Sequence, residues 1–215
     1  MLGDLTVPDE ITAEVDLAPV MCAQCGFEFG GEGEAWPSVC PHCGRDIDLE
    51  AQFAYCRGRD AFIAGQDLLI ALTPKMRRKN ITTSFEMEGL QFYSQAYSAL
   101  QRAFQGQLAE SQRRLAIEMT AAMVLVFQTH GSISPFESSY WTTLMVDLTT
   151  QLDILEVRER LRKLPTGLSG AVPRWRWRLR LRQLERALIE LDTKIKTLEQ
   201  NIGFVEPPRA RRRFV

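Results

Sequence analysis

Two closely spaced cysteine pairs near the start of the chain constrain its fold more than any other feature. Cys22 and Cys25 form the first pair, Cys40 and Cys43 form the second, and fourteen residues separate the pairs. Four thiolates arranged in this way suit one tetrahedral ion, because each pair supplies two neighbouring corners and the loop brings the pairs together. The spacing therefore predicts a metal site.

A glycine directly follows each pair, at Gly26 and Gly44. The chain must turn there so that backbone N–H groups point back at sulfur, and glycine adopts such a turn without a Cβ penalty. The repeated Cys-x-x-Cys-Gly motif resembles the zinc-ribbon and rubredoxin-like knuckle superfamily over about residues 20–47. The resemblance implies a small β-hairpin unit that binds its ion through Cys22, Cys25, Cys40 and Cys43.

The identity of the ion is predicted from the rest of the chain. The short loop between the pairs also resembles the rubredoxin-like tail of rubrerythrins, which carries iron beside a di-iron bundle that needs Glu-x-x-His ligands. This chain has two histidines, His42 and His130, and neither lies in such a motif. We therefore expect Zn²⁺, with iron as the less favoured alternative. His42 is expected to be a solvated or supporting side chain, and Trp36 to cover the small core of the unit.

Charge is distributed unevenly along the chain, although the net charge is −1. Residues 1–50 carry eleven acids and one base, whereas residues 156–215 carry sixteen bases and seven acids. Binding of nucleic acid requires Lys or Arg near the phosphates, so any such contact is expected from the C-terminal third. No stretch is long and apolar enough for a membrane span. The cysteine usage is typical of a reducing cytoplasm, where we expect the protein to reside.

After the cysteine pairs, apolar residues recur at helical spacing. The sequence predicts a mainly α fold, with a small N-terminal β zinc ribbon, an α-helical bundle and a long coiled-coil-like C-terminal helix. Gly58 and Gly65 weaken the first predicted helix, because glycine lowers helix propensity. Cys56 is expected to be a packing residue and His130 a C-terminal helix cap. Helices are predicted over 48–73, 85–105, 108–129 and 135–163. The expected parts are an acidic extended arm (1–19), a zinc ribbon (20–47), a bundle (48–163), a linker (164–173), a long amphipathic helix (174–203) and a basic tail (204–215).

The predicted C-terminal helix carries an unbroken heptad seam. Flanking charges favour a parallel homodimer over an antiparallel one, because Arg180 and Lys194 would then face Glu185 and Glu199 of the partner subunit. The alternative is that the same seam packs on the bundle of its own chain, and the sequence favours neither arrangement. The seam consists of Trp177, Leu181, Leu184, Leu188, Leu191, Ile195, Leu198 and Ile202.

Arginines crowd the start of this helix, where they oppose the helix dipole and repel one another. Three interpretations remain open: a solvated face, a dock for an acidic protein surface, or a contact to phosphates or anionic lipid. The acidic arm and ribbon of this chain or of another copy are one available acidic surface. The candidate partner-binding residues are Arg174, Trp175, Arg176, Trp177, Arg178, Arg180 and Arg182.

These features lead to a prediction of function. The sequence contains none of the common motifs of nucleotide-binding loops, serine hydrolases or zinc proteases, and a four-cysteine zinc site has no open coordination position. We expect a non-enzymatic zinc-binding adaptor or scaffold that binds a protein partner, or a second copy, through the helical domain and residues 177–202. The alternatives are a nucleic-acid-associated factor that uses the C-terminal arginines, and a rubredoxin-like iron electron carrier.

Overall fold

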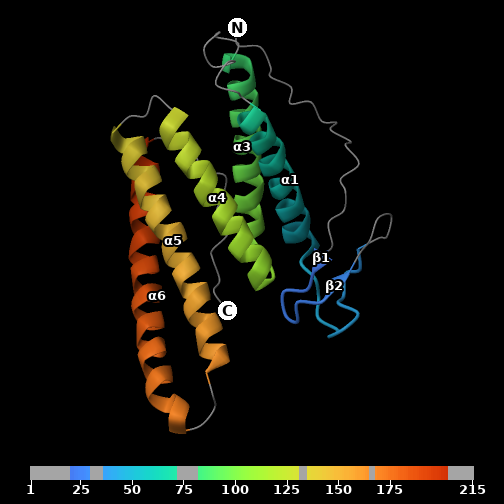
Figure 1. The fold of residues 1–215 in the computed structure, drawn as a ribbon, viewed down its shortest axis with the longest axis vertical. Helices are drawn as coiled ribbons and strands as arrows, with labels where there is room; N and C mark the ends of the chain where they lie inside the picture. The colour runs from blue at the N-terminus through green and yellow to red at the C-terminus, as the bar shows by residue number, and fades with distance from the viewer. Residues whose placement is uncertain (1–19, 30–35, 72–81, 131–134, 165–167, 203–215) are drawn as a thin grey trace.

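The computed structural model describes residues 20–29, 36–71, 82–130, 135–164 and 168–202, and Figure 1 shows their arrangement. Helices dominate, and one short two-stranded hairpin lies near the N-terminus, so the predicted mainly α fold class is confirmed. None of the described helices combines the length and apolar character needed to cross a membrane. The elements are β1 (Val20–Met21), β2 (Glu28–Phe29), α1 (Leu49–Ala71), α3 (Thr82–Gln105), α4 (Glu110–His130), α5 (Pro135–Lys163) and α6 (Leu168–Ile202).

Helices α1 and α3 form an antiparallel pair whose backbones approach closely (Figure 1). A Cβ atom added at Gly65 would lie 2.5 Å from the Tyr93 ring, and one added at Gly58 would lie 2.7 Å from the Leu100 side chain. The two glycines therefore lower the helix propensity of α1 but allow α3 to pack against it. This packing explains why a helix forms over most of the predicted range 48–73 despite them.

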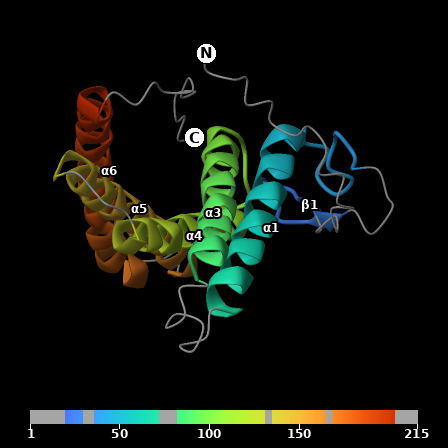
Figure 2. The ribbon, with the colours of Figure 1, turned by 90° about the horizontal axis from the view of Figure 1, so that it is seen from above.

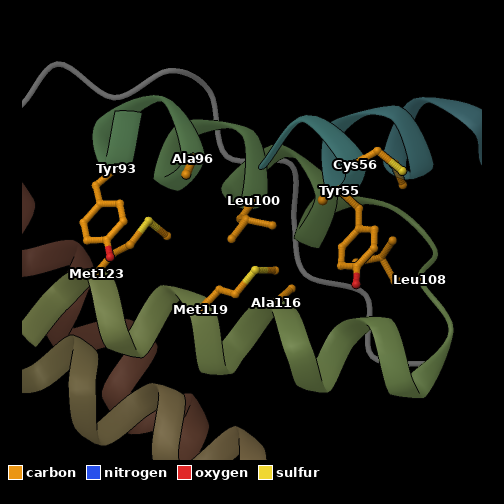
Figure 3. Close-up of a cluster of buried hydrophobic side chains, with 11 residues drawn as sticks. Tyr55, Cys56, Tyr93, Ala96, Leu100, Leu108, Ala116, Met119 and Met123 are labelled. Atoms are coloured by element: carbon orange, nitrogen blue, oxygen red, sulfur yellow. The ribbon is translucent and has the colours of Figure 1, made fainter. Parts of the chain in front are cut away.

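The first buried core lies between α1, α3 and α4. Figure 3 shows Tyr93 and Leu100 of α3 facing Met119 and Met123 of α4. Cys56 of α1 belongs to the same core with 1% of its surface exposed, which confirms it as a packing residue. Burial raises the pKa of the Cys56 thiol, because the charged form is poorly solvated there, so this group stays neutral.

A second core joins α4 to α5 and α6. Ile117 and Val124 of α4 pack with Leu144 and Leu148 of α5 and with Ile195 of α6. Helix α4 is thus packed on two sides, which explains why residues 121–127 are all apolar. Seen from above in Figure 2, α4 and α5 lie between the α1–α3 pair and α6, and α6 forms the outer end of the array.

The observed start of α6 corrects one prediction. The helix begins at Leu168 rather than at residue 174, so the predicted linker over 164–173 is wrong for its last six residues. Pro173, which is expected to start the helix, lies within it. Proline lacks a backbone N–H, so α6 lacks the helical hydrogen bond from residue 173 to the carbonyl of Ser169.

The heptad seam of α6 packs on α5 of the same chain. Leu184 and Leu188 are buried against Ile154 and Val157, and Ile195 lies in the second core. This is one of the two arrangements that the sequence leaves open. A parallel homodimer through residues 177–202 would require the seam to leave α5, and such a dimer stays a prediction.

Candidate metal centre

Each cysteine pair lies at the turn of a small hairpin. Strands β1 and β2 pair antiparallel, with Val20 opposite Phe29, and carry the first pair between them. An antiparallel bridge between Val39 and Asp46 closes the second hairpin. The described residues 20–29 and 36–47 are called the knuckle unit below.

The two turns have matching backbone geometry. The N–H of Gly26 donates to the carbonyl of Cys22 at 2.8 Å, and the N–H of Gly44 donates to the carbonyl of Cys40 at 2.9 Å. Both glycines are in the left-handed region, with φ of 72° and 69°. A side chain would be strained there, which confirms the predicted need for glycine at both positions.

The four cysteines come together in space as the sequence predicts. All four Sγ atoms lie within 4.8 Å of one another, and the Cys22–Cys43 and Cys25–Cys40 separations are both 3.7 Å. A Zn–S bond of about 2.3 Å corresponds to a tetrahedron with edges of about 3.8 Å. Both short separations join different hairpins, so an ion at this cluster would tie the two hairpins together. Cys22 and Cys40 are buried, whereas Cys25 and Cys43 are exposed.

In the metal-free state the thiols differ in acidity. Burial favours the neutral form of Cys22, but the backbone N–H groups of Cys25 and Gln24 and the neighbouring thiols outweigh it and lower the pKa of Cys22 to about 7. At Cys25 the backbone N–H of Phe27 favours the thiolate. Although Cys25 is exposed, partial desolvation of its sulfur and hydrogen bonds with the other three thiols outweigh this effect and raise the pKa of Cys25 to about 12. One thiolate therefore forms readily near neutral pH, while Cys25 keeps its proton until an ion displaces it.

Metal retention is expected to weaken as the pH falls, and to weaken more steeply below pH 7. Because cysteine binds metal as a thiolate, Cys25 releases a proton on binding at any neutral pH, whereas Cys22 releases one only below its pKa of about 7. The apparent affinity should therefore lose about a further tenfold per pH unit below that point. Competition with a chromophoric chelator, corrected for the chelator's own protonation, measures this slope. A slope that stays constant through pH 7 would contradict the assignment.

Asp48 joins the knuckle unit to two helices. Its Oδ1 accepts the N–H of Ala51 at 3.1 Å, which caps the start of α1, and its Oδ2 accepts the N–H of Gln107 at 2.9 Å. The second bond holds the segment before α4 against α1. This role of Asp48 is not among the predictions from the sequence, although an acidic residue just before a helix is a recognisable capping signal.

A pair of buried glutamines continues this connection. The Gln52 amide donates to Oε1 of Gln112 at 3.1 Å and receives a bond of 2.9 Å in return. The same Gln52 amide donates to the carbonyl of Met21, the neighbour of Cys22, at 3.2 Å. Oε1 of Gln112 also accepts the N–H of Ala109, in the manner of a capping box at the start of α4. Nothing in the sequence pairs these two residues, because sixty positions separate them.

Replacing either glutamine of this pair alone is expected to destabilise the protein strongly, because its partner then lacks a buried hydrogen bond. Gln112→Leu leaves the Gln52 amide and the Ala109 N–H short of a buried acceptor, which should lower the free energy of unfolding by about 2–3 kcal/mol. Changing both glutamines to leucine should cost less than the sum of the single changes. Urea denaturation of metal-loaded Gln52→Leu, Gln112→Leu and the double variant measures this coupling. Strictly additive losses in the free energy of unfolding would contradict it.

Aromatic side chains surround the knuckle unit. Trp36 stacks on Phe53 of α1 with 4.4 Å between ring centroids, so it lies at the junction between the unit and α1. Trp36 also packs against the first core, whereas the expectation from the sequence places it over the small core of the unit. His42 stacks on Phe27 at 5.3 Å and is exposed, and it does not belong to the four-sulfur cluster.

Comparisons with protein-family models, with curated proteins and with solved structures gave no match. The chemistry of this cluster therefore follows from its own geometry: four sulfur atoms, close enough together to bind one ion, on a unit fixed to α1 and α4.

The structure places three of the candidate partner-binding residues in contacts made near the tip of the α5–α6 hairpin. Trp177 is partly buried, with the Arg160 guanidinium 4.8 Å from its ring centroid. Arg180 lies 3.7 Å from the carboxylate of Asp153. Arg174 donates to the carbonyl of Leu164 at 2.7 Å. These residues therefore contribute to packing within the chain.

The other candidates, Trp175, Arg176, Arg178 and Arg182, are exposed. Because α6 begins at Leu168, the arginines lie beyond its first turn, where the helix dipole has little effect. The unfavourable interaction between these arginines and the helix dipole is therefore weaker than expected from the sequence, which places the helix start at residue 174. The acidic arm (1–19), the basic tail (204–215) and the side chain of His130 lie outside the described part of the chain.

Proposed function

We propose that the protein is a non-enzymatic adaptor or scaffold whose knuckle unit is held at the junction of α1 and α4 by a zinc ion. The observation that carries this proposal is the four-sulfur cluster, in which the Cys22–Cys43 and Cys25–Cys40 separations of 3.7 Å fit a zinc–thiolate tetrahedron. A zinc ion with four protein ligands has no open position for water or substrate and no redox change, so its role would be structural.

The position of the cluster supports this role. The backbone of Met21, directly before Cys22, is bonded to Gln52 of α1, and Gln52 is bonded to Gln112 of α4. Ordering the four cysteines around an ion therefore also orders the starts of two helices. These bonds favour a structural role for the metal, in which it orders the helices for binding, over a catalytic role.

Native mass spectrometry of protein purified without added metal tests the proposal. We expect one zinc ion per chain and a colourless protein. A bound iron ion that can be reversibly reduced would overturn the proposal in favour of an electron carrier, for which the exposed Cys25 and Cys43 would offer a path to the surface. A protein that is fully folded and carries no metal would overturn the structural role of the ion.

A further inference from the structure

The outer side of α6 presents large apolar side chains to solvent. Trp175, Leu179 and Ile189 are 63%, 43% and 69% exposed, although α6 buries its heptad seam on α5. In Figures 1 and 2, α6 lies at the edge of the helix array, with α5 between it and α4. These residues therefore face away from the packed side of α6.

These residues form a regular stripe along the helix. Trp175, Leu179, Arg182, Arg186 and Ile189, called the outer stripe, are spaced alternately by four and three residues. This is the repeat of a helix–helix seam, and it lies on the side of α6 opposite the seam that contacts α5. The outer stripe extends over about 21 Å, at 1.5 Å per residue. A straight partner helix of three to four turns can follow it.

The arginines in the middle of the outer stripe have no acidic partner among the described residues. Neighbouring arginines do: Arg158 lies 3.3 Å from Glu185, and Arg180 lies 3.7 Å from Asp153. No ion pair or hydrogen bond within the described segments joins Arg182 or Arg186 to a carboxylate. The stripe therefore combines apolar ends with an unpaired positive centre.

We propose that the outer stripe docks an acidic amphipathic helix of a protein partner. Apolar side chains of that helix would cover Trp175, Leu179 and Ile189. Carboxylates in its middle turns would form charge-assisted hydrogen bonds with Arg182 and Arg186, whose planar guanidinium groups suit such contacts. The proposal rests on the interaction role proposed above and specifies the chemistry of the partner.

Two other anionic partners fit the outer stripe less well. A nucleic acid would meet the arginines with its phosphates, but it would leave Leu179 and Ile189 against a polar backbone and find one aromatic ring, Trp175, for stacking. A lipid surface would bury the apolar ends only by bringing Arg182 and Arg186 into the same apolar layer. An acidic amphipathic helix would cover the apolar side chains and also pair with the two arginines.

A pair of synthetic helical peptides tests this proposal with the full chain. The first carries leucine along one heptad seam and glutamate at the two central seam positions, and the second carries lysine at those two positions. Fluorescence anisotropy of the labelled peptides should show at least tenfold tighter binding of the glutamate peptide. Arg182→Glu should abolish this preference, because the new carboxylate offsets the charge of Arg186 at the centre of the outer stripe. Arg176→Glu makes the same charge change at an exposed position outside the stripe and should alter binding by less than twofold.

The same titrations with a single-stranded oligonucleotide and with phosphatidylserine vesicles complete the test. Tighter binding of either one, lost in Arg182→Glu, would overturn the proposal in favour of nucleic acid or lipid. Equal binding of both peptides, or binding of neither, would also overturn it. Metal content and helical circular dichroism are measured on the same samples. Failure of peptide binding in a metal-loaded, folded protein rejects the outer stripe, whereas the absence of zinc rejects the proposed structural role of the ion.

Discussion

Removal of the metal by a chelator is expected to expose the backbone amides at the starts of α1 and α4 to solvent exchange, while α5 and α6 remain protected. The ion would join the two knuckle hairpins, and the Met21–Gln52–Gln112 bonds connect them to the two helices. Apparent binding free energies of structural zinc reach about 10–16 kcal/mol in small domains, so its loss should be the largest single perturbation of this protein. Hydrogen exchange followed by mass spectrometry measures the change peptide by peptide.

A ligand variant provides the control for this experiment. Cys40→Ser removes a buried cysteine of the cluster and should reproduce the exchange pattern of the chelated protein, and added chelator should then have no further effect. Exchange that rises equally in all helices would contradict the local coupling. Unchanged exchange at residues 48–56 and 106–113 would show that the glutamine pair does not connect the metal to the helices.

Gly65→Ala is expected to destabilise the protein by about 1–3 kcal/mol, the usual cost of overpacking a core. Helix propensity alone predicts the opposite sign, because alanine is favoured over glycine inside a helix by about 1 kcal/mol. The new methyl group would lie 2.5 Å from the buried Tyr93 ring and 3.1 Å from the carbonyl oxygen of Gly89. Neither group can move freely, so the clash should outweigh the gain. Thermal or urea denaturation measures the net effect.

A variant at the neighbouring residue Gln66 separates the effect of helix propensity from the effect of the steric clash. Gln66 is exposed on the same turn of α1, so Gln66→Ala changes helix propensity without adding any group to the α1–α3 contact. We expect this variant to stay within about 0.5 kcal/mol of the parent protein, as surface changes usually do. A stabilised Gly65→Ala variant would show that α1 and α3 can separate at little cost.

Local patterns in the sequence were sufficient to predict most of the helices and the cysteine cluster. The observed bounds of α3, α4 and α5 lie within three residues of the predicted ranges, because apolar spacing and the breaks at Gly106 and Pro135 are local signals. The cluster was predictable because Cys-x-x-Cys spacing fixes two ligands at once. The reasons for Gly58 and Gly65, in contrast, depend on residues of α3 about 30–40 positions away.

The contacts around the four-cysteine cluster illustrate what a single sequence does not reveal. Gln52 and Gln112 are ordinary polar residues in amphipathic helices, and only the packing of α4 beside α1 places them together. The outer stripe shows a second feature that the sequence alone does not determine. Its 4-3-4-3 spacing is present in the sequence, but α6 has two such stripes, and the fold determines which of them α5 covers.

The order of the helices has a consequence for how the chain folds. Most helix contacts join neighbours in the sequence, namely α1 with α3, α4 with α5, and α5 with α6. Such short-range contacts favour rapid folding. The bonds that join the knuckle unit and α1 to α4 span many more residues, from Met21 to Ser111 and from Gln52 to Gln112. The helical pairs should therefore assemble first and the metal centre should dock last, so metal supplied after helix formation would still be incorporated.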